Sequence, residues 1–563
     1  MPSKKDTIKL LEEIADMLEL KGENKFKIQA YRTGAGSIKK IDFDFDNIVK
    51  YNELNKIKGI GAGLQKVIYE FYETNESSLY KSLREEIPEG LEQLLKIKGL
   101  NPAKIKLINS ELGIKNLEEL EDAAINNLLV NVKGFGENLQ EKILTGIKEY
   151  KVYSNYILLN EALRLSDDLL NKLTSFKSVK LINKSGELRR GSEIISQMVF
   201  VILTSNQNNF IDDLKKVCNF KKLKDKILIE ELSDVPVYVF ITVEENEYYL
   251  QLFLTTGSDE FIKSINAEQI DGQSEEEIFS GLKMPFIIPE MREKEYFEQK
   301  KDSLLRNSNL TFNDFKGLLH FHTTFSDGKN TLVEMNNAAE ELGFKYAAVN
   351  DHSKSAFYAN GMDEERVLQQ RKELKQINLQ SKTILFSGIE ADILVDGELD
   401  YNNEILSGFD FVISSVHSRF NLDEKEMTKR IIKAVENPYV DVLAHPSGRL
   451  LLSRNPYKFD VKKVIDACFA NNVAIEINSS PKRLDLEWRL VYYAREKGCL
   501  FSINPDAHTI SEISYLVYGI MMGRKAGLQS EEVINCFNLN KFKKFLNRKV
   551  KRSFSSEAVL LND

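Results

Sequence analysis

Cysteine is scarce in this chain, and its spacing gives no sign of a CxxC motif. Only four cysteines occur in 563 residues, and none lies in a CxxC pair, so buried free thiols in a reducing cytoplasm are expected. No apolar run reaches the roughly 18 to 20 residues that a membrane span needs. The N-terminus, Met1-Pro-Ser-Lys-Lys-Asp6, lacks the apolar core of a secretory signal. These absences predict a cytoplasmic protein with no membrane partner.

An excess of positive charge is also missing. The formal net charge of -8 argues against a protein coated in positive charge. It does not exclude DNA binding, because a local cluster of Lys, Arg or backbone N–H groups is enough to bind phosphates. The length of 563 residues predicts three or four domains at roughly 150 residues each. The 42% hydrophobic and 29% charged content is typical of globular domains.

Residues 6–150 are predicted to be helical, and within them a Lys-Gly turn between two helical stretches occurs three times, at Ile57–Gly61, Ile97–Asn101 and Val132–Gly136. Glycine allows a tight turn with positive φ, and such a turn presents backbone N–H groups to a phosphate at a helix N-terminus. The repetition is typical of helix-hairpin-helix motifs and favours backbone binding of DNA over turns that merely join packed helices. The candidate DNA-binding residues are Gly59, Gly61, Gly63, Lys66, Gly99, Lys104, Gly134 and Gly136.

The pattern changes near Tyr150 to mixed strand and helix, with strand-like runs at Ser196–Leu203 and Val235–Thr242. Residues Arg292–Lys316 are charged and lack periodicity, which is typical of a linker.

From Gly317 onward, strand-like runs alternate with helical stretches such as Leu332–Leu342 and Val461–Ala470. Repeated β-α units predict a parallel sheet, and this many units predict a barrel. The seven expected strands are Leu318–Leu319, Tyr346–Val349, Ile384–Phe386, Phe409–Val416, Val440–Leu443, Val473–Ile477 and Leu500–Ile503.

Histidine has an uneven distribution, because all six lie between His320 and His508. They follow the expected strands together with several acids, and the C-terminal strand ends of a parallel barrel converge on one mouth. Nitrogen and carboxylate ligands suit Zn, Mn or Fe(II), and this many ligands predict two or three ions with a bridging carboxylate, suited to phosphate-ester hydrolysis. The strand-end candidates are His320, His322, Asp327, Asp351, His352, Glu390, Asp392, His417, His445, Asp506 and His508.

The last 250 or so residues resemble a PHP (polymerase and histidinol phosphatase) domain. The resemblance rests on six motifs: His320-x-His-Thr-x-x-Ser-Asp-Gly328, Asp351-His-Ser353, Gly388-Ile-Glu-x-Asp-Ile393, Ser415-Val-His-Ser418, Ala444-His-Pro446 and Asp506-Ala-His508. It implies a site for three divalent ions, with Mn²⁺ favoured and Zn²⁺ or Fe²⁺ also compatible with the ligands. The first ion would be held by His320, His322, Glu390 and Asp506, the second by Glu390, His417 and His445, and the third by Asp327, His352 and His508.

Glu390, His417 and Asp506 are the candidate catalytic residues within that ligand set. Arg449 and Arg483 are candidates for contact with phosphate, with ordinary ion pairs as the alternative, and Lys354 is a weaker candidate.

The whole chain resembles bacterial family X DNA polymerases, which join a β-type polymerase core to a C-terminal PHP domain. Besides the helix-hairpin-helix turns, the resemblance rests on Lys21–Arg32, Leu188-Arg-Arg-Gly191, Thr256-Gly-Ser258 and Pro285–Arg292. The polymerase site departs from the family pattern. Where the family has Gly-Asp-x-Asp, this chain has Ser196-Gln-Met-Val199, the third aspartate aligns near Val239, and Glu187 replaces the serine of the nucleotide-binding turn. The remnants of that site are Arg189, Arg190, Gly191, Gln197, Val199 and Gly257.

Nucleotidyl transfer by two metal ions needs carboxylates to hold the cations against the triphosphate. Gln197 offers one neutral oxygen and the side chain of Val199 offers none. Since each ~1.4 kcal/mol of lost transition-state stabilisation is a tenfold loss of rate, the missing ligands predict an inactive polymerase site. Glu193 is the nearby acid that would have to substitute.

The expected fold class is multidomain α+β and α/β: a helical helix-hairpin-helix N-terminal region, a β-polymerase-like palm and thumb, and a C-terminal distorted (βα)7 PHP barrel. The expected domains are an 8-kDa-like helical DNA-binding domain at 1–80, a fingers-like helical domain at 81–150, a degenerate palm at 151–242, a thumb-like part at 243–300, a linker at 301–316 and the PHP domain at 317–563.

Four functions stay open. The favoured one is a DNA-processing hydrolase that binds gapped, nicked or 3′-end substrates and removes 3′ nucleotides or 3′ blocking groups, as the family's 3′–5′ exonuclease activity in repair implies. A gap-filling polymerase would need the missing carboxylates. A histidinol-phosphate-type phosphatase would have no use for three DNA-binding turns. A non-catalytic DNA-binding protein would not need the complete ligand set.

Overall fold

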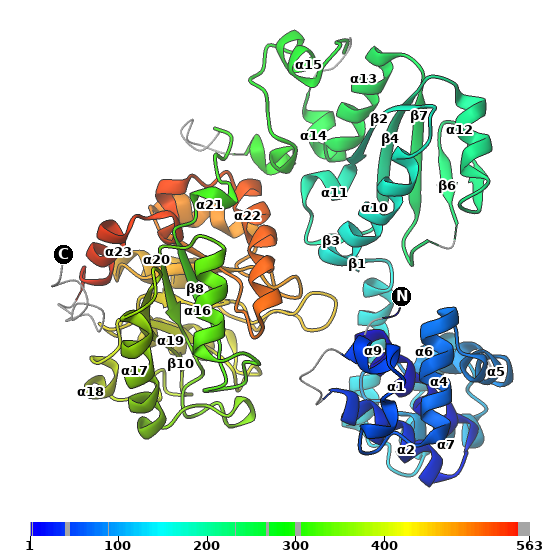
Figure 1. Cartoon of the computed structure of the whole chain (residues 1–563), viewed down its shortest axis with the longest axis horizontal. Helices are drawn as coiled ribbons and strands as arrows, with labels where there is room; N and C mark the ends of the chain where they lie inside the picture. Colours follow the sequence, from blue (N-terminus) through cyan, green and yellow to red (C-terminus); the bar gives the residue numbers. More distant parts are fainter. Residues whose placement is uncertain are drawn as a thin grey trace. The chain divides into compact units, whose positions relative to one another are not determined.

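The structure is a computed structural model that describes residues 2, 4–39, 45–87, 89–230, 232–265, 270–298 and 306–549 (Figure 1). The chain divides into two compact units, Met1–Ser154 and Asn155–Asp563. None of the helices in the described ranges is both long and apolar enough to cross a membrane. All four cysteines are free, as expected; Cys468 and Cys499 are buried, and Cys218 and Cys536 are half-buried.

The first unit is helical, as the sequence predicts, and its helices share one hydrophobic core across the expected boundary at residue 80. The amphipathic spacing of Leu11, Ile14 and Leu18 directs these side chains of α1 into that core. The elements are α1 (Lys4–Lys21), α2 (Lys25–Lys39), α3 (Phe45–Lys50), η1 (Leu54–Lys56), α4 (Ala62–Thr74), α5 (Ser78–Glu86), α6 (Glu89–Leu94), α7 (Pro102–Leu112), α8 (Leu117–Ile125), η2 (Leu129–Asn131) and α9 (Glu137–Tyr153).

The second unit begins with a mixed five-stranded sheet in the order β2-β4-β7-β6-β5, at the place where the sequence predicts the palm. Strand β4 is buried along its whole length, with α10 and α12 packed on one face and α13 on the other. The elements are β1 (Ile157–Leu158), α10 (Leu159–Thr174), β2 (Val179–Ser185), α11 (Gly186–Arg190), β3 (Ile194–Ile195), β4 (Met198–Thr204), α12 (Gln207–Leu214), β5 (Phe220–Lys222), β6 (Ile227–Ile229) and β7 (Val237–Thr242).

A smaller aromatic core follows this sheet and surrounds the fully buried Arg292, whose guanidinium contacts Glu275. Residues 301–305 of the expected linker lie outside the described residues. Residues 306–316 have no long helix or strand and pack on the barrel, with Leu310 fully buried. The elements are α13 (Glu245–Thr256), α14 (Asp259–Ser264), α15 (Glu275–Gly281), η3 (Pro289–Met291), η4 (Lys294–Tyr296) and η6 (Phe312–Asp314).

The C-terminal part is a nearly closed barrel of seven parallel strands in sequential order from β8 to β14. All seven expected strands are present, and Figure 1 shows helices such as α16 and α17 outside them. A parallel bridge between Phe321 and Ala507 joins the first strand to the segment after the last. The strands are β8 (Gly317–Phe321), β9 (Tyr346–Val349), β10 (Ile384–Asp392), β11 (Phe411–Ser415), β12 (Val442–Leu443), β13 (Ala474–Asn478) and β14 (Phe501–Asn504).

The last helix of the described residues, α23 (Leu539–Leu546), covers the N-terminal ends of the strands. Phe542 of α23 stacks on the buried ring of Tyr346 with ring centroids 4.4 Å apart, and the Tyr346 hydroxyl donates to the Phe537 carbonyl at 2.9 Å. The other elements are α16 (Leu332–Glu341), η7 (Phe357–Ala359), α17 (Glu364–Asn378), α18 (Asn403–Leu406), α19 (Glu424–Val435), α20 (Val461–Ala470), α21 (Trp488–Lys497), η8 (Ile510–Tyr515), α22 (Leu516–Lys525), η9 (Ser530–Glu532), η10 (Ile534–Cys536) and α23 (Leu539–Leu546).

Candidate metal centre and the polymerase-like site

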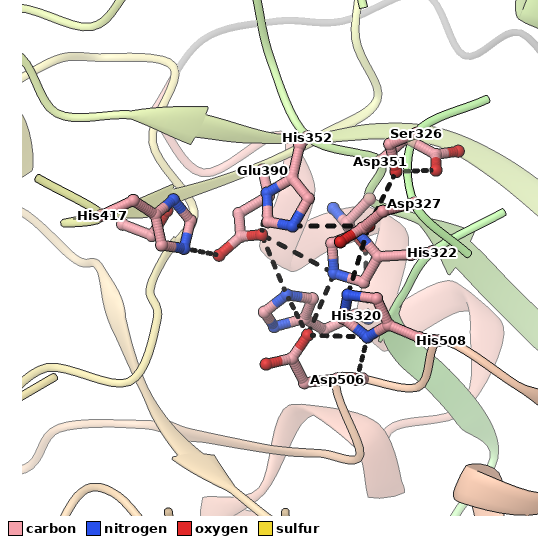
Figure 2. A network of polar contacts seen from close by, with 12 residues as sticks. His320, His322, Ser326, Asp327, Asp351, His352, Glu390, His417, Asp506 and His508 are labelled. Carbon is pink, nitrogen blue, oxygen red and sulfur yellow. Dashed lines mark hydrogen bonds and ion pairs between the residues drawn. The ribbon is translucent and has the colours of Figure 1, made fainter. Parts of the chain in front are cut away.

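The nine predicted metal-ligand residues gather at the C-terminal ends of the barrel strands, and most of them are labelled in Figure 2. Glu390 of β10 is at their centre, fully buried. Its Oε1 lies 2.9 Å from His445 Nε2 and 3.3 Å from His417 Nε2. Its Oε2 lies 3.0 Å from His352 Nδ1, and 3.6 Å from Nε2 of both His320 and His322. One carboxylate therefore faces five imidazoles, which is the position that a bridging ligand requires.

The other two acids lie to one side of Glu390. Asp506 Oδ1 is 3.0 Å from His322 Nε2 and 3.4 Å from His320 Nε2. Asp327 Oδ1 is 3.3 Å from His508 Nε2 and 3.7 Å from His352 Nε2. Within 4.8 Å of one another, the ligand atoms form three groups: His322, Asp327, His352 and His508; His320, His322 and Asp506; and His352, Glu390 and His417.

Several buried atoms of this cluster have no hydrogen-bond partner, and this pattern fits cation binding. A buried polar atom without a partner is costly, so proteins leave few of them. Here five atoms of the predicted ligands are in that state: His320 Nε2, His322 Nδ1, His352 Nδ1, Glu390 Oε2 and His445 Nδ1. Nitrogen and carboxylate donors in this number suit divalent ions of the Mn, Fe and Zn type, so the residues present fit divalent metal binding.

The electrostatics of the cluster also suit cations. Burial lowers the pKa of His322 to about 3, with His508 and His352 adding to the effect, so its imidazole is neutral and keeps a lone pair. Burial opposes ionisation of Asp327, but His508 outweighs it and lowers the pKa of that carboxyl to about 2. Burial likewise raises the pKa of Glu390, but the imidazoles around it, His417 first, hold it well below its usual range.

Three acids orient the ligands from behind. Glu476 Oε1 lies 2.5 Å from His320 Nδ1, and Asp392 Oδ1 lies 2.6 Å from His417 Nδ1. Each of these contacts is made by Nδ1, so the Nε2 atom of the same histidine points toward the cluster. In metal sites, acids that contact a ligating histidine in this way fix the orientation and tautomer of its ring. Glu476 is not among the residues that the sequence patterns predicted for the site. Its available signal was one acid inside the apolar run Val473–Ile477.

The third acid, the buried Asp351, holds the loop that carries Asp327. It accepts hydrogen bonds from Thr323 N at 2.7 Å and Ser326 Oγ, a network visible in Figure 2. Gly328 completes that loop, because a Cβ there would lie 2.6 Å from the backbone of His322. The Ser-Asp-Gly sequence thus folds back against the strand end and presents the Asp327 carboxylate to the cluster.

Backbone strain occurs at three ligands. His320, His445 and Asp506 have φ values of 60°, 27° and 52°, in the left-handed region that residues with a Cβ rarely adopt. Such conformations persist where the surrounding structure determines them, and they concentrate at functional sites.

The candidate phosphate-binding arginines differ in their contacts. Arg483 Nε is 3.8 Å from Asp506 Oδ2, so this side chain lies at the edge of the cluster. The Arg449 guanidinium pairs with Glu193 at 2.9 Å and donates to the carbonyls of Arg483 and Leu484. That geometry favours the ion-pair alternative for Arg449, and it occupies Glu193, the acid that would have to replace a polymerase carboxylate. Lys354 Nζ pairs with Glu364 at 2.8 Å.

The polymerase remnants have become structural contacts. Arg189 binds Glu275 through both terminal nitrogens, at 2.9 and 2.5 Å, and Arg190 Nε donates to Glu293 at 2.9 Å. Gly191 ends α11 with φ 62°, and a Cβ on Gly257 would lie 2.7 Å from the Ile262 side chain.

The position of the missing carboxylates carries no acid. Gln197 is exposed, and Val199 is buried on the β4 face that contacts Gly186. The Glu187 carboxylate accepts hydrogen bonds from Ser196 N at 2.6 Å and Gln197 N at 3.3 Å, so it is held against the segment that precedes β4.

The expected position of the third aspartate, near Val239, lies on β7. Val239 pairs with Phe200 and lies in the core under α10 and α12, on the opposite face of the sheet from Val199. The β7 residue in register with Val199 is Tyr238. Neither residue has a carboxylate.

The three helix-hairpin-helix turns share one backbone geometry. Gly59, Gly99 and Gly134 have φ values of 96°, 98° and 87°, a region that favours glycine. In each turn the N–H of the next residue donates to the carbonyl two residues before the glycine, at 2.9 to 3.1 Å.

The turns differ in what covers their glycines. A Cβ added at Gly134 would meet nothing within 4 Å, so the third turn faces open space. At the first turn a Cβ on Gly59 would lie 2.8 Å from Ser37 Oγ of α2, and at the second turn a Cβ on Gly99 would lie 3.1 Å from Leu139 of α9. Lys104 Nζ also donates to the Gly99 carbonyl at 2.9 Å. The third turn is therefore the most accessible to a phosphate, whereas the glycines of the first and second turns pack against neighbouring helices. Gly61, Gly63 and Gly136 follow these glycines, and a Cβ at any of them would meet nothing within 4 Å.

Comparison with known families agrees with this division. A helix-hairpin-helix domain model matches residues 2–77, a SAM-like helix-hairpin-helix tandem model matches residues 91–149, and a PHP domain model matches residues 319–480. Asp506 and His508 follow the matched PHP segment in sequence. The fold and the site together define a multidomain protein that joins helix-hairpin-helix modules of the DNA-binding type to a PHP barrel.

The relatives make the assignment specific. The chain is 33% identical to the DNA polymerase/3′-5′ exonuclease PolX of Bacillus subtilis over 573 residues, which cover 97% of this chain and 99% of that protein. The chain belongs to the same family, the bacterial family X DNA polymerases with a C-terminal PHP domain. Its barrel region is also similar to a probable phosphatase of Aliivibrio fischeri, 29% identical over 40% of this chain and 91% of that protein. A probable phosphatase of Thermoanaerobacter is 30% identical over 31% of this chain and 71% of that protein.

Proposed function

We propose that this protein is a metal-dependent phosphodiesterase that removes nucleotides or blocking groups from the 3′ ends of DNA, and that its polymerase site is inactive. The observation that carries the proposal is the convergence of six imidazoles with the carboxylates of Glu390, Asp327 and Asp506 at the C-terminal ends of the barrel strands. The name of the Bacillus subtilis relative, which includes a 3′-5′ exonuclease activity, supports the direction of degradation.

We assign three divalent ions to the cluster, with Mn²⁺ favoured and Zn²⁺ or Fe²⁺ compatible with the donors. Glu390 would be shared between the set with His320, His322 and Asp506 and the set with His417 and His445. The remaining set is Asp327, His352 and His508. When bound, ions so placed lower the pKa of a coordinated water and neutralise negative charge on a phosphodiester.

The protein's own residues orient this chemistry. Glu476 and Asp392 hold Nδ1 of His320 and His417, which keeps each Nε2 toward Glu390. Arg483 lies at the cluster edge beside Asp506 and is partly exposed, so its guanidinium is positioned to contact a phosphate oxygen of the substrate. We assign Arg449 a positioning role, because its contacts hold the carbonyls of Arg483 and Leu484.

The need for carboxylate ligands to divalent ions also explains why we propose an inactive polymerase site. Two-metal nucleotidyl transfer needs carboxylates, but Gln197, Val199 and Tyr238 occupy the relevant strand positions. Glu187 adds a negative charge beside the nucleotide-binding turn, where a triphosphate would be repelled. The helical unit and the polymerase-like sheet then serve to bind and present DNA.

The proposed activity is tested by following a 3′-labelled strand in gapped, nicked and single-stranded DNA with Mn²⁺, Zn²⁺ or Fe²⁺. We expect loss of the 3′ label in wild type and at least a thousandfold slower loss in Glu390→Ala and His320→Ala. Glu365→Gln, an exposed change on α17, is the matched control and should retain the wild-type rate. A wild-type protein that leaves every 3′ end intact with all three metals would contradict the proposal.

Two alternatives are separated by parallel assays. Primer extension on gapped DNA with Mg²⁺ or Mn²⁺ tests synthesis, and robust extension would overturn the inactive polymerase site. The similarity of the barrel to probable phosphatases favours a small-molecule substrate as the second candidate. Release of phosphate from histidinol phosphate without degradation of DNA would support that candidate instead.

A further inference from the structure

A short turn next to the metal cluster exposes two aromatic rings. Turn η7 (Phe357–Ala359) follows the ligand His352 closely in sequence. Phe357 is 89% exposed and Tyr358 is 71% exposed. Aromatic side chains usually bury most of their surface, so two adjacent exposed rings call for a function.

The turn is well anchored, so its exposure does not result from loose packing. Its flanking residues Ala356 and Met362 are fully buried. Met362 N donates to the His352 carbonyl at 2.8 Å, and Gly361 N donates to the Ala356 carbonyl at 3.0 Å. Gly361 is required there, because a Cβ would lie 2.0 Å from the Ser353 carbonyl. The protein therefore holds the backbone that carries the two rings in a fixed place.

A second set of contacts fixes the turn relative to the cluster. Arg366 of α17 donates to the Asn360 carbonyl at 2.9 Å and also to the carbonyl of Phe325. Asn360 Nδ2 donates to the Ser326 carbonyl at 3.3 Å, next to the ligand Asp327. The aromatic turn and the Asp327 loop are thus one hydrogen-bonded assembly.

The Tyr358 ring lies at the edge of the cluster of predicted ligands, and Phe357 is its neighbour in the turn. The Tyr358 ring centroid is 6.2 Å from the ring centroids of both His352 and His417. A nucleotide whose phosphodiester reaches the cluster would bring its base to this edge. Bases stack on exposed aromatic rings in proteins that bind single strands, with little dependence on sequence because every base has a π-face.

We propose that Phe357 and Tyr358 form a stacking platform for the unpaired base of the 3′-terminal nucleotide. This inference rests on the proposed 3′-end activity and deepens it, because it names two residues that would contact the terminal base. The ring of Tyr358, rather than its hydroxyl, is the contributing group. The platform accepts any of the four bases, and it discriminates against a terminal residue that has no base.

The first test uses the terminal base as the variable. The substrates are two single strands of DNA that differ only in a 3′-terminal nucleotide with a base or with an abasic tetrahydrofuran residue. We expect wild type to cleave the base-ended strand with about tenfold higher kcat/KM, the lower part of the range that base–aromatic stacking gives. Phe357→Ala/Tyr358→Ala should cleave both strands at the rate of the abasic one. Tyr358→Phe should keep the wild-type preference.

The matched control is Phe469→Ala, which removes a half-exposed aromatic residue near the C-terminus of α20. It should leave both rates unchanged. A double variant that keeps the tenfold preference would overturn the platform while leaving the exonuclease intact. Failure of wild type to cleave either strand would instead contradict the proposed activity, so the two failures are distinguishable.

The second test measures binding without turnover. A single strand with 2-aminopurine at its 3′ end is titrated with protein in EDTA, where stacking quenches the fluorescence of the base. Quenching is expected with wild type, Tyr358→Phe and Phe469→Ala, and should be lost in the Phe357→Ala/Tyr358→Ala variant. Equal quenching by wild type and the double variant would contradict the platform, whatever the variant's activity.

Discussion

Glu476 and His320, from strands β13 and β8, form a 2.5 Å contact through Nδ1 of the imidazole, with both side chains fully buried. The contact fixes His320 with Nε2 facing Glu390 and Asp506. A residue outside the predicted ligand set thereby determines which nitrogen of His320 faces the cluster.

Glu476→Gln should therefore weaken metal binding by about 10- to 100-fold, because outer hydrogen-bond partners of ligating histidines contribute this much. Titration calorimetry with Mn²⁺ or Zn²⁺ on the chelator-treated protein measures it. Asp392→Asn removes the partner of His417 and should also weaken metal binding. The exposed control Glu365→Gln should leave metal affinity unchanged. Unchanged affinity in Glu476→Gln would show that the contact does not orient His320 for metal.

Removal of metal should lower the thermal stability of the second unit. Five buried ligand atoms lack hydrogen bonds, so cations that bind them stabilise the folded state by about 2.7 kcal/mol when present at a hundredfold excess over Kd. Melting curves in EDTA and after addition of Mn²⁺ or Zn²⁺ provide the measurement. His445→Ala should reduce the difference in melting temperature between the protein in EDTA and the protein with added metal. A melting temperature that is independent of both chelator and metal would argue against a metal centre.

Stability should fall in acid partly through Glu293. Burial raises the pKa of this carboxyl, but Lys525 and Arg190 outweigh burial and lower it to about 2. A depressed pKa contributes stability that is fully present above the unfolded value near 4.5 and is lost as the pH falls toward 2. The contribution is roughly 3 kcal/mol, which urea unfolding across that pH range can detect.

Two variants test the acid effect. Glu293→Gln should flatten the pH dependence between 4.5 and 2, and it should also destabilise at neutral pH because buried Lys525 loses its partner. Asp212→Asn removes an exposed pair with Lys215 and should leave both properties unchanged. If Glu293→Gln keeps the full acid sensitivity, the pair with Lys525 is not its source.

The lysines beside the helix-hairpin-helix turns should differ in their contribution to DNA binding. Lys66→Ala, beside the first turn, should weaken binding to all sequences equally and reduce the slope of log K against log salt by about 0.9. Lys104→Ala should change that slope less, because Lys104 Nζ is bound to the Gly99 carbonyl. Fluorescence anisotropy across salt concentrations measures both slopes. Equal slopes for the two variants would contradict the difference between the two lysines.

The sequence predicted the fold and the gathering of ligands because both follow from simple patterns. Seven apolar runs separated by helices specify a parallel barrel, and strand ends meet at one mouth, so His320 and His508 could be placed together despite their separation. Glycines at matching positions likewise predicted the three turns.

What the sequence did not reveal depended on three-dimensional packing. Glu476 was missed because one acid in a strand does not show which histidine it faces. The partial cover of Gly99 by Leu139 comes from a helix 40 residues away in sequence, and the ion pair of Arg449 with Glu193 joins residues 256 positions apart.

The central claim is that the strand-end cluster binds divalent cations around Glu390. Crystals of the full chain grown with Mn²⁺, with diffraction data collected on both sides of the manganese absorption edge, test it most directly. The account predicts anomalous peaks at coordination distance from Glu390 and its surrounding histidines, and the loss of those peaks in Glu390→Ala. Peaks absent from this cluster, with manganese saturating in the crystal, would contradict it.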